Sequence, residues 1–177
     1  MGWDNTGPKE VEGIRWEPGK ERNNLYDAPA RYMFNCRYAG GVTMTVANCA
    51  DMPGDWASPG KRGTMFFGSR GRWLWVDRSG IKASDEKILK TSLSPKEFRF
   101  REQANHMTDW LDCIRSREET IAPVNAGHRS ASIGHLGKIA CALGGSFKWD
   151  PKKERITDNP ILNGMLTREY RRDWKLG

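Results

Sequence analysis

The three histidines of the chain are the first residues to test for chemistry. His128 and His135 are seven residues apart in a segment with helical periodicity, so they share one face of a helix. They would stand about 10 Å apart along its axis. One metal ion cannot bind both side chains, because its ligands lie about 2 Å from it. We therefore expect no metal site.

His106 and Asp109 form the other candidate for acid–base chemistry. Their spacing of three residues suits one side of a helix, and a carboxylate can orient a general base. The same pair also makes ordinary polar contacts at a helix start, and we favour that interpretation. The sequence contains neither a Gly-x-Ser-x-Gly elbow nor a Cys–His spacing typical of a nucleophile.

The four cysteines stand far apart, with no Cys-x-x-Cys pair. This spacing argues against a zinc ribbon or a redox dithiol. Cys113 and Cys141 fall in helical apolar patterns, and Cys36 and Cys49 in strand-like ones. We expect free, mostly buried thiols, which favours a reducing compartment.

Glycine clusters are the usual sign of a phosphate cradle, and two occur here, at residues 60–63 and 68–71. Both lie between strand-like segments, whereas a dinucleotide loop joins a strand to a helix. We therefore expect hairpin turns at both places and no Rossmann domain in this chain.

The first half of the chain predicts strands. Residues 9–16 form a first strand, and residues 31–38 and 42–48 alternate on either side of Gly40-Gly41, which predicts a β-hairpin. A meander follows over residues 64–67, 72–77 and 81–83. Trp73 and Trp75 share one face of it, so we expect a broad apolar surface that supports a homo-oligomer.

The period changes from two to about 3.6 after Pro95, which predicts helices. The first spans residues 100–117, with an apolar stripe of Ala104, Met107, Trp110, Leu111 and Ile114. The second spans residues 126–143 and stops at Gly144-Gly145. A strand over 147–149 and a short helical piece over 160–166 complete the chain.

These elements predict an α+β fold: a mostly antiparallel, open sheet of six or more strands with helices packed on one face. The length of 177 residues fits one domain over residues 1–177. In the second helix, small residues allow close approach to the sheet: Ala126, Ser130, Gly134, Gly137 and Ala140. His128 and Arg129 remain at its first turn, where polar side chains can face a ligand.

The bulk composition excludes several classes of protein. The formal net charge is +7, but acidic residues are interspersed with the basic ones, so we expect no nucleic-acid function. No apolar run is long enough to span a bilayer, and no export signal is visible, so we expect no membrane partner. As it stands the chain predicts a soluble, cytoplasmic protein, and its opening on a turn-rich segment suggests a fragment.

Several motifs in order resemble one family. They are GTMFFGSRGRWLWVDRSGIKAS, HMTDWLDCIRSREETIAPVNAGHRSASIGHLGKIACALG, FKWDPKKERI and REYRRDWKL, and the resemblance extends over nearly the whole chain. They resemble the C-terminal domain of the Gfo/Idh/MocA oxidoreductases, a domain with a dihydrodipicolinate-reductase-like α+β fold. That resemblance implies a substrate and oligomerisation half, which would work with an N-terminal Rossmann domain that binds NAD or NADP.

The resemblance also implies a function and a few site residues. It implies hydride transfer between a nicotinamide and a hydroxyl of a sugar or related polyol. The family's glycine fingerprint and Glu-Lys-Pro segment are absent, so this chain alone would bind no cofactor, and its catalytic residues are unknown. Trp3, Asp4 and Asn5 would line the substrate pocket, with His128 and Arg129 as further candidates. A plain turn or helix-cap role is the alternative for each.

Two functions follow as hypotheses. The first is the substrate and oligomerisation half of a sugar oxidoreductase, either truncated or completed by a separate Rossmann-domain partner. The second is a non-catalytic interaction module whose aromatic sheet self-associates or packs on another protein. The native compartment stays open, because an export signal could precede Met1.

Overall fold

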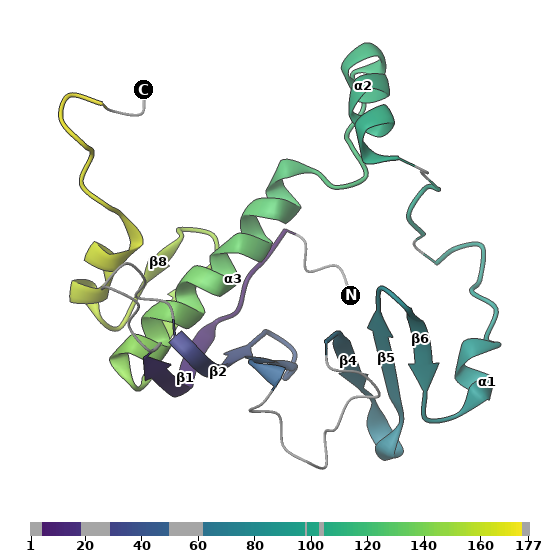
Figure 1. Cartoon of the computed structure of the whole chain (residues 1–177), viewed down its shortest axis with the longest axis horizontal. Helices are drawn as coiled ribbons and strands as arrows, with labels where there is room; N and C mark the ends of the chain where they lie inside the picture. Colours follow the sequence, from purple (N-terminus) through teal and green to yellow (C-terminus); the bar gives the residue numbers. More distant parts are fainter. Residues whose placement is uncertain (1–4, 19–28, 50–61, 98, 103–104, 175–177) are drawn as a thin grey trace. The chain divides into compact units, whose positions relative to one another are not determined.

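A computed structural model describes residues 5–18, 29–49, 62–97, 99–102 and 105–174 (Figure 1). The chain divides into two compact units. The first comprises Met1–Asn48 and Asn105–Gly177, and the second comprises Cys49–Ala104. The expectation of one domain over residues 1–177 stays a prediction.

The first unit is built on a five-stranded antiparallel sheet. Its strands are β1 (Glu10–Pro18), β2 (Pro29–Arg37), β3 (Thr43–Ala47), β7 (Ser146–Asp150) and β8 (Arg155–Ile156), in the order β3-β2-β1-β7-β8. The predicted first strand and the hairpin across Gly40-Gly41 are confirmed. The late strand β7 pairs directly with β1, so the two ends of the sequence meet at the centre of this sheet.

The two faces of this sheet differ because side chains alternate along each strand. One face carries the core, including Val11, Phe34 and Phe147, all at most 4% exposed. The other face is polar, and Arg37 of β2 forms ion pairs there with Glu10 and Glu12 of β1. The alternation seen in the sequence therefore separates the core face from the solvent face.

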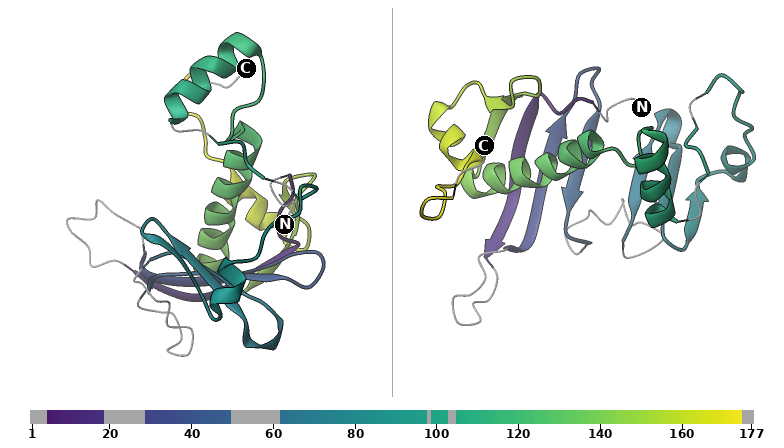
Figure 2. Two further views of the ribbon diagram at one scale, coloured as in Figure 1. Left: turned by 90° about the vertical axis from the view of Figure 1, so that its right-hand side faces the viewer. Right: turned by 90° about the horizontal axis from the view of Figure 1, so that it is seen from above.

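The helix α3 (Val124–Leu143) lies over β1 and β2 on the core face (Figure 2). Gly13 and Gly137 permit the close approach. A Cβ at Gly13 would lie 2.3 Å from the Ala140 carbonyl oxygen, and one at Gly137 would lie 2.3 Å from the Phe34 ring. The helix ends at Gly144, whose φ of 69° is left-handed, as its sequence predicts.

The helix α2 (His106–Ser116) is shorter than predicted. It begins at His106 because Asn105 is its N-cap, with Oδ1 accepting hydrogen bonds from Met107 N and Thr108 N. Its predicted apolar stripe is exposed rather than buried: Met107, Trp110, Leu111 and Ile114 are 43–52% exposed. Asp109 and Cys113 are the buried residues instead.

The segment after α3 is held against the sheet by a 3₁₀ helix, η4 (Pro160–Leu166). Asn163 of η4 accepts a hydrogen bond from Ile156 N and donates one to Ile156 O, both at 2.9 Å. Leu162 adds its side chain to the core. The short helical piece predicted over 160–166 is confirmed, as a 3₁₀ helix.

The second unit contains a three-stranded antiparallel sheet. Its elements are β4 (Thr64–Phe67), the 3₁₀ turn η3 (Ser69–Gly71), β5 (Trp73–Asp77), β6 (Gly80–Ala83) and α1 (Glu86–Leu89). The predicted meander and glycine turn are confirmed, and so is the α+β class. The prediction of a single sheet with six or more strands was wrong, because the described strands form two sheets, one of five strands and one of three.

The tryptophans of this meander are less exposed than predicted. Trp75 is 2% exposed, and its ring lies 5.7 Å from Lys82 Nζ. The opposite face carries Phe66 and Ile81, which are 41% and 56% exposed, together with half-buried aliphatic residues of β5. Phe66 and Ile81, rather than Trp75, therefore contribute to the exposed apolar surface on that side of the sheet. The homo-oligomer stays a prediction.

Candidate functional site

The segment before β1 runs along the end of β7. Lys9 N donates to Arg37 O at 2.8 Å, and Trp149 N donates to Lys9 O at 2.8 Å. Pro8 is fully buried, and a Cβ at Gly7 would lie 3.1 Å from Pro151 Cβ. The backbone thereby places Asn5 and Thr6 beside the turn that joins β7 to β8.

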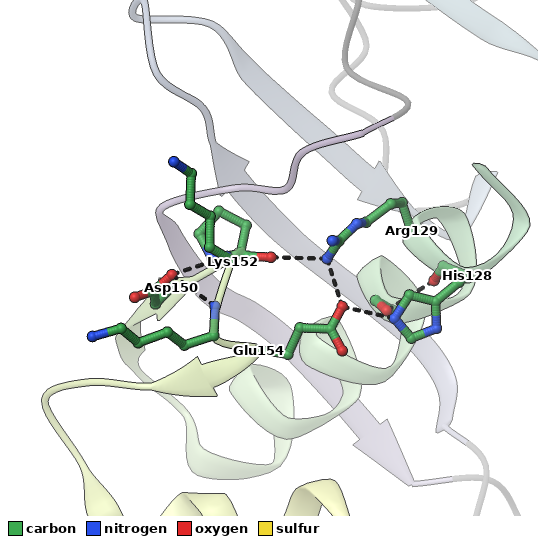
Figure 3. A network of polar contacts seen from close by, with 8 residues as sticks. His128, Arg129, Asp150, Lys152 and Glu154 are labelled. Atoms are coloured by element: carbon green, nitrogen blue, oxygen red, sulfur yellow. Dashed lines mark hydrogen bonds and ion pairs between the residues drawn. The ribbon is translucent and has the colours of Figure 1, made fainter. Parts of the chain in front are cut away.

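The second turn of α3 is tied to the same β7–β8 turn by a cluster of charged groups. Arg129 Nη1 donates to Pro151 O at 2.9 Å and to Glu154 Oε1 at 2.6 Å. His128 Nε2 lies 2.8 Å from the same Glu154 oxygen (Figure 3). The arginine side chain is 24% exposed and Glu154 is 41% exposed, so this cluster is only partly shielded from water. We call it the Glu154 clasp.

Asp150 organises the turn itself. Its Oδ1 accepts hydrogen bonds from Lys152 N at 2.9 Å and Lys153 N at 3.1 Å (Figure 3). These backbone hydrogen bonds, with the nearby cations, hold the pKa of the Asp150 carboxyl below its ordinary value. The carboxylate therefore stays ionised at neutral pH.

An open pocket of about 520 Å³ lies between these segments. That volume is within the range of small-molecule sites. Its walls come from the segment before β1, the second turn of α3, β7, the turn that follows β7, and the residue after β8. They are formed by Asn5, Thr6, Lys9, Arg129, Lys148, Trp149, Asp150, Pro151, Lys152 and Thr157.

The pocket walls combine one aromatic side chain with many polar groups. Trp149 is 8% exposed and offers a fixed apolar wall. Asn5, Thr6 and Thr157 offer amide and hydroxyl groups that can both donate and accept hydrogen bonds. The lining residues include four basic ones and one acidic one. This arrangement can bind and orient a polar small molecule.

The structure brings together three of the five residues that the sequence suggested for the substrate side. Asn5 and Arg129 line the same pocket, and His128 contacts Arg129's partner Glu154. Trp3 and Asp4 lie outside the described residues. Their role in substrate binding stays a prediction for all five.

Several pocket residues were missed from the sequence. Lys148 and Trp149 lie in FKWDPKKERI, a motif that contributed to the resemblance without being assigned a site role. They reach the pocket because β7 pairs with β1, with Phe147 opposite Val11. The aromatic and basic residues around Asp150 were a visible signal of a binding site in the sequence. Only the pairing of β7 with β1, which are far apart in the sequence, places these residues beside Asn5.

Asp109, which the sequence suggested as a partner of His106 in acid–base chemistry, makes a structural contact. Asp109 is 2% exposed, and its Oδ2 accepts a hydrogen bond from Ile121 N at 3.0 Å, so this carboxylate supports the loop after α2. In the described ranges, no cluster of three or more His, Cys, Asp or Glu side chains could hold a metal ion. Nor does any described helix have the length and apolar character needed to cross a membrane.

The described residues also do not fit a dinucleotide. A pyrophosphate site needs a glycine loop that leads from a parallel strand into a helix. The described glycine turn, Gly68–Gly71, instead joins the antiparallel strands β4 and β5. All strand pairs in the described part of the chain are antiparallel. The molecule is thus an α+β domain with a basic, small-molecule-sized pocket.

The comparisons with known proteins identify the family. A family model described as the oxidoreductase family, C-terminal alpha/beta domain, matches residues 85–176, just over half of the chain. The chain therefore belongs to the Gfo/Idh/MocA oxidoreductase family. That family is typically NAD(P)-dependent. Comparison with curated proteins and with solved structures gave no match.

Proposed function

We propose that this chain forms the substrate side of an NAD(P)-dependent oxidoreductase that acts on sugars or related polyols. The observation that carries the proposal is the shared pocket of Asn5 and Arg129, which are more than 120 residues apart in the sequence. The family resemblance suggested both residues for the substrate side. Their meeting in one pocket of suitable size supports a binding role there.

The chemistry of the pocket suits a polyhydroxylated ligand. The C–H face of a sugar can pack on an aromatic wall such as Trp149, while its hydroxyl groups need both donors and acceptors. Asp150 and Asn5 offer acceptors, and Arg129 and the lysines offer donors. The role of this chain in our proposal is to bind and orient the sugar.

The cofactor in this proposal is held by a Rossmann domain outside the described residues, either on the same polypeptide or on a partner chain. We also propose that the working form is a homo-oligomer. The exposed apolar face of the three-stranded sheet, with Phe66 and Ile81, supports self-association.

The test combines this chain with a separately produced NAD(P)-binding domain of the same family. Nicotinamide reduction is followed across a panel of sugars and polyols. We expect activity only when both parts are present, and a lower kcat/KM for Asn5→Ala. Asn125→Ala, an exposed asparagine on α3 outside the pocket, is the matched control. Failure to obtain activity with a series of partner domains would contradict the proposal.

The alternative is a non-catalytic interaction module, and one observation favours it. The apolar stripe of α2 is exposed, and such a stripe marks a surface for protein contact. A module of this kind would bind a protein through α2 and show no dependence on Asn5. The same asparagine variant therefore separates the two functions.

A further inference from the structure

We propose that the pocket binds an anionic group of its ligand, so that the substrate is a sugar acid or a sugar phosphate rather than a neutral polyol. This inference rests on the proposed function for its sugar part. The anionic part rests on the charges around the pocket, and it can be tested independently.

The first argument is the charge of the walls. Lys9, Arg129, Lys148 and Lys152 are among the lining residues, and Asp150 is the single acidic one. Like charges gathered around a concave surface raise its potential and attract an ion of opposite sign. A neutral ligand would leave this repulsion in place.

The second argument is that the nearby acids are engaged by other groups. Asp158, which follows Thr157, accepts a hydrogen bond at Oδ1 from Lys148 N at 2.9 Å. Glu154 is engaged by the clasp to Arg129 and His128. Glu10, which lies across from Lys148 in the register of β1 and β7, forms its ion pair with Arg37. Within the described part of the chain, no residue forms an ion pair with the side chain of Lys9, Lys148 or Lys152.

The third argument concerns Arg129, the least exposed of the four cations. Both of its hydrogen bonds leave from Nη1, toward Pro151 O and Glu154 Oε1. No described residue accepts a hydrogen bond from its Nε or Nη2 group. The clasp therefore fixes the guanidinium while leaving donors for a carboxylate or phosphate, which a guanidinium binds well.

A carboxylate and a phosphate offer the same chemistry here, namely negatively charged oxygens that accept hydrogen bonds. The remaining walls suit the polyol body of the ligand. Trp149 packs on carbon, and Thr6 and Thr157 bind hydroxyl groups. The ligand class is thus a polyol or sugar with one terminal anionic group.

The experiment measures dissociation constants by calorimetry on the purified chain, at constant ionic strength. Gluconate and sorbitol form the matched ligand pair, because they differ in a carboxylate against a hydroxymethyl group. Sorbitol phosphate and inorganic phosphate distinguish a phosphate ligand from a carboxylate. The variants are Lys9→Gln and Lys148→Gln, alone and together, with the exposed Lys96→Gln as control.

We expect at least one of the anionic polyols to bind about tenfold more tightly than sorbitol. Each lysine variant should weaken that binding roughly two- to fivefold, because partly exposed charge pairs contribute modestly. Added salt should weaken it further by screening. Lys96→Gln should leave the dissociation constant unchanged.

The outcomes separate this inference from the proposed function. Binding of inorganic phosphate with no gain from a polyol body supports the anionic site and contradicts the sugar substrate. Equal binding of gluconate, sorbitol phosphate and sorbitol overturns the anionic site and leaves the sugar substrate standing. Absence of binding by every anion at millimolar concentration also overturns the anionic site, while the activity test with a Rossmann partner decides the function.

Discussion

The close contact between α3 and the sheet makes a quantitative prediction at Gly137. A Cβ there would lie 2.3–2.5 Å from three atoms of the Phe34 ring, where ordinary contacts are 3.4–4 Å. The helix or the ring must therefore shift by about 1 Å in a core where Phe34 is 4% exposed. Overpacking of this kind costs about 1–3 kcal/mol.

Gly134 on the same helix supplies the matched control. A Cβ at Gly134 meets no atom within 4 Å among the described residues. Replacing a helical glycine by alanine gains about 0.5–1 kcal/mol in either place, from helix propensity and the unfolded state. The difference between Gly137→Ala and Gly134→Ala therefore isolates the steric cost. We expect Gly134→Ala to be more stable than the parent chain and Gly137→Ala to be less stable than Gly134→Ala by about 1–3 kcal/mol.

The assay is urea unfolding followed by circular dichroism, with a double-mutant cycle. Phe34→Leu removes the ring that the new methyl group meets, so the two changes together should cost less than their sum. Equal stability of Gly137→Ala and Gly134→Ala, within about 0.5 kcal/mol, would refute the contact between α3 and the sheet.

Three further predictions concern titration and association. Burial raises the pKa of the Cys36 thiol from 9.0 to about 12, so an unfolded chain ionises first and stability should fall between pH 9 and 12, by up to about 1.4 kcal/mol per pH unit. Urea titrations should show a shallower alkaline slope for Cys36→Val, and a thiol reagent should label exposed Cys49 before Cys36. The lowered pKa of Asp150 stabilises the native turn above pH 3.8, and this contribution is lost as pH falls through the folded value. The protection of the turn amides, relative to their intrinsic exchange rates at the same pH, should fall at acid pH in the parent chain, and Asp150→Asn should lower it already at neutral pH; unchanged protection would contradict the role of this carboxylate. Ile81→Lys should lower the mass measured by light scattering, whereas Ile161→Lys, at a residue that is 87% exposed in the first unit, should not. A parent chain that is monomeric at high concentration would end the oligomer proposal.

Local elements of the fold were predictable because their signals are local. The alternation on both sides of Gly40-Gly41 needs only a tight turn to become a hairpin, and both glycines have positive φ values of 87° and 80°. The end of α3 followed from Gly144 for the same reason. Such signals depend on only a few neighbouring residues, so they can be read without knowledge of the rest of the chain.

The assembly of these elements was less predictable. Alternation shows that a strand has one apolar face, but it does not show which distant strand will be its neighbour. The pairing of β1 with β7, and the separation of β4, β5 and β6 into their own sheet, could not be read from the pattern. Similarly, the stripe of α2 indicates that this helix has an apolar face, without indicating what contacts it.

The candidate site shows the same division. Asn5 and Arg129 were suggested by the family resemblance, which carries three-dimensional information that a single sequence lacks. Lys148 and Trp149 were missed because their position depends on the register of β7 against β1. Their alternation was visible, but a lysine on a strand is usually solvated, and only its neighbours make it part of a pocket.

The pocket and the core are mechanically linked through α3, which leads to a last prediction. Arg129 and Gly137 lie about two turns apart on the same helix. A methyl group at Gly137 pushes α3 away from the sheet, while the β7–β8 turn that accepts from Arg129 stays with the sheet. Gly137→Ala should therefore weaken binding of the anionic ligand several-fold, although Gly137 lies outside the pocket.

Gly134→Ala again serves as the control, because it changes the same helix without a clash. The measurement is calorimetry with gluconate or sorbitol phosphate, whichever binds the parent chain more tightly, under conditions where both variants are folded. Arg129→Gln should abolish the difference between the two variants, since the helix then holds no donor against Pro151 and Glu154. Unchanged affinity in Gly137→Ala would mean that the Glu154 clasp follows α3 when it moves, and that the pocket does not depend on the packing of the core.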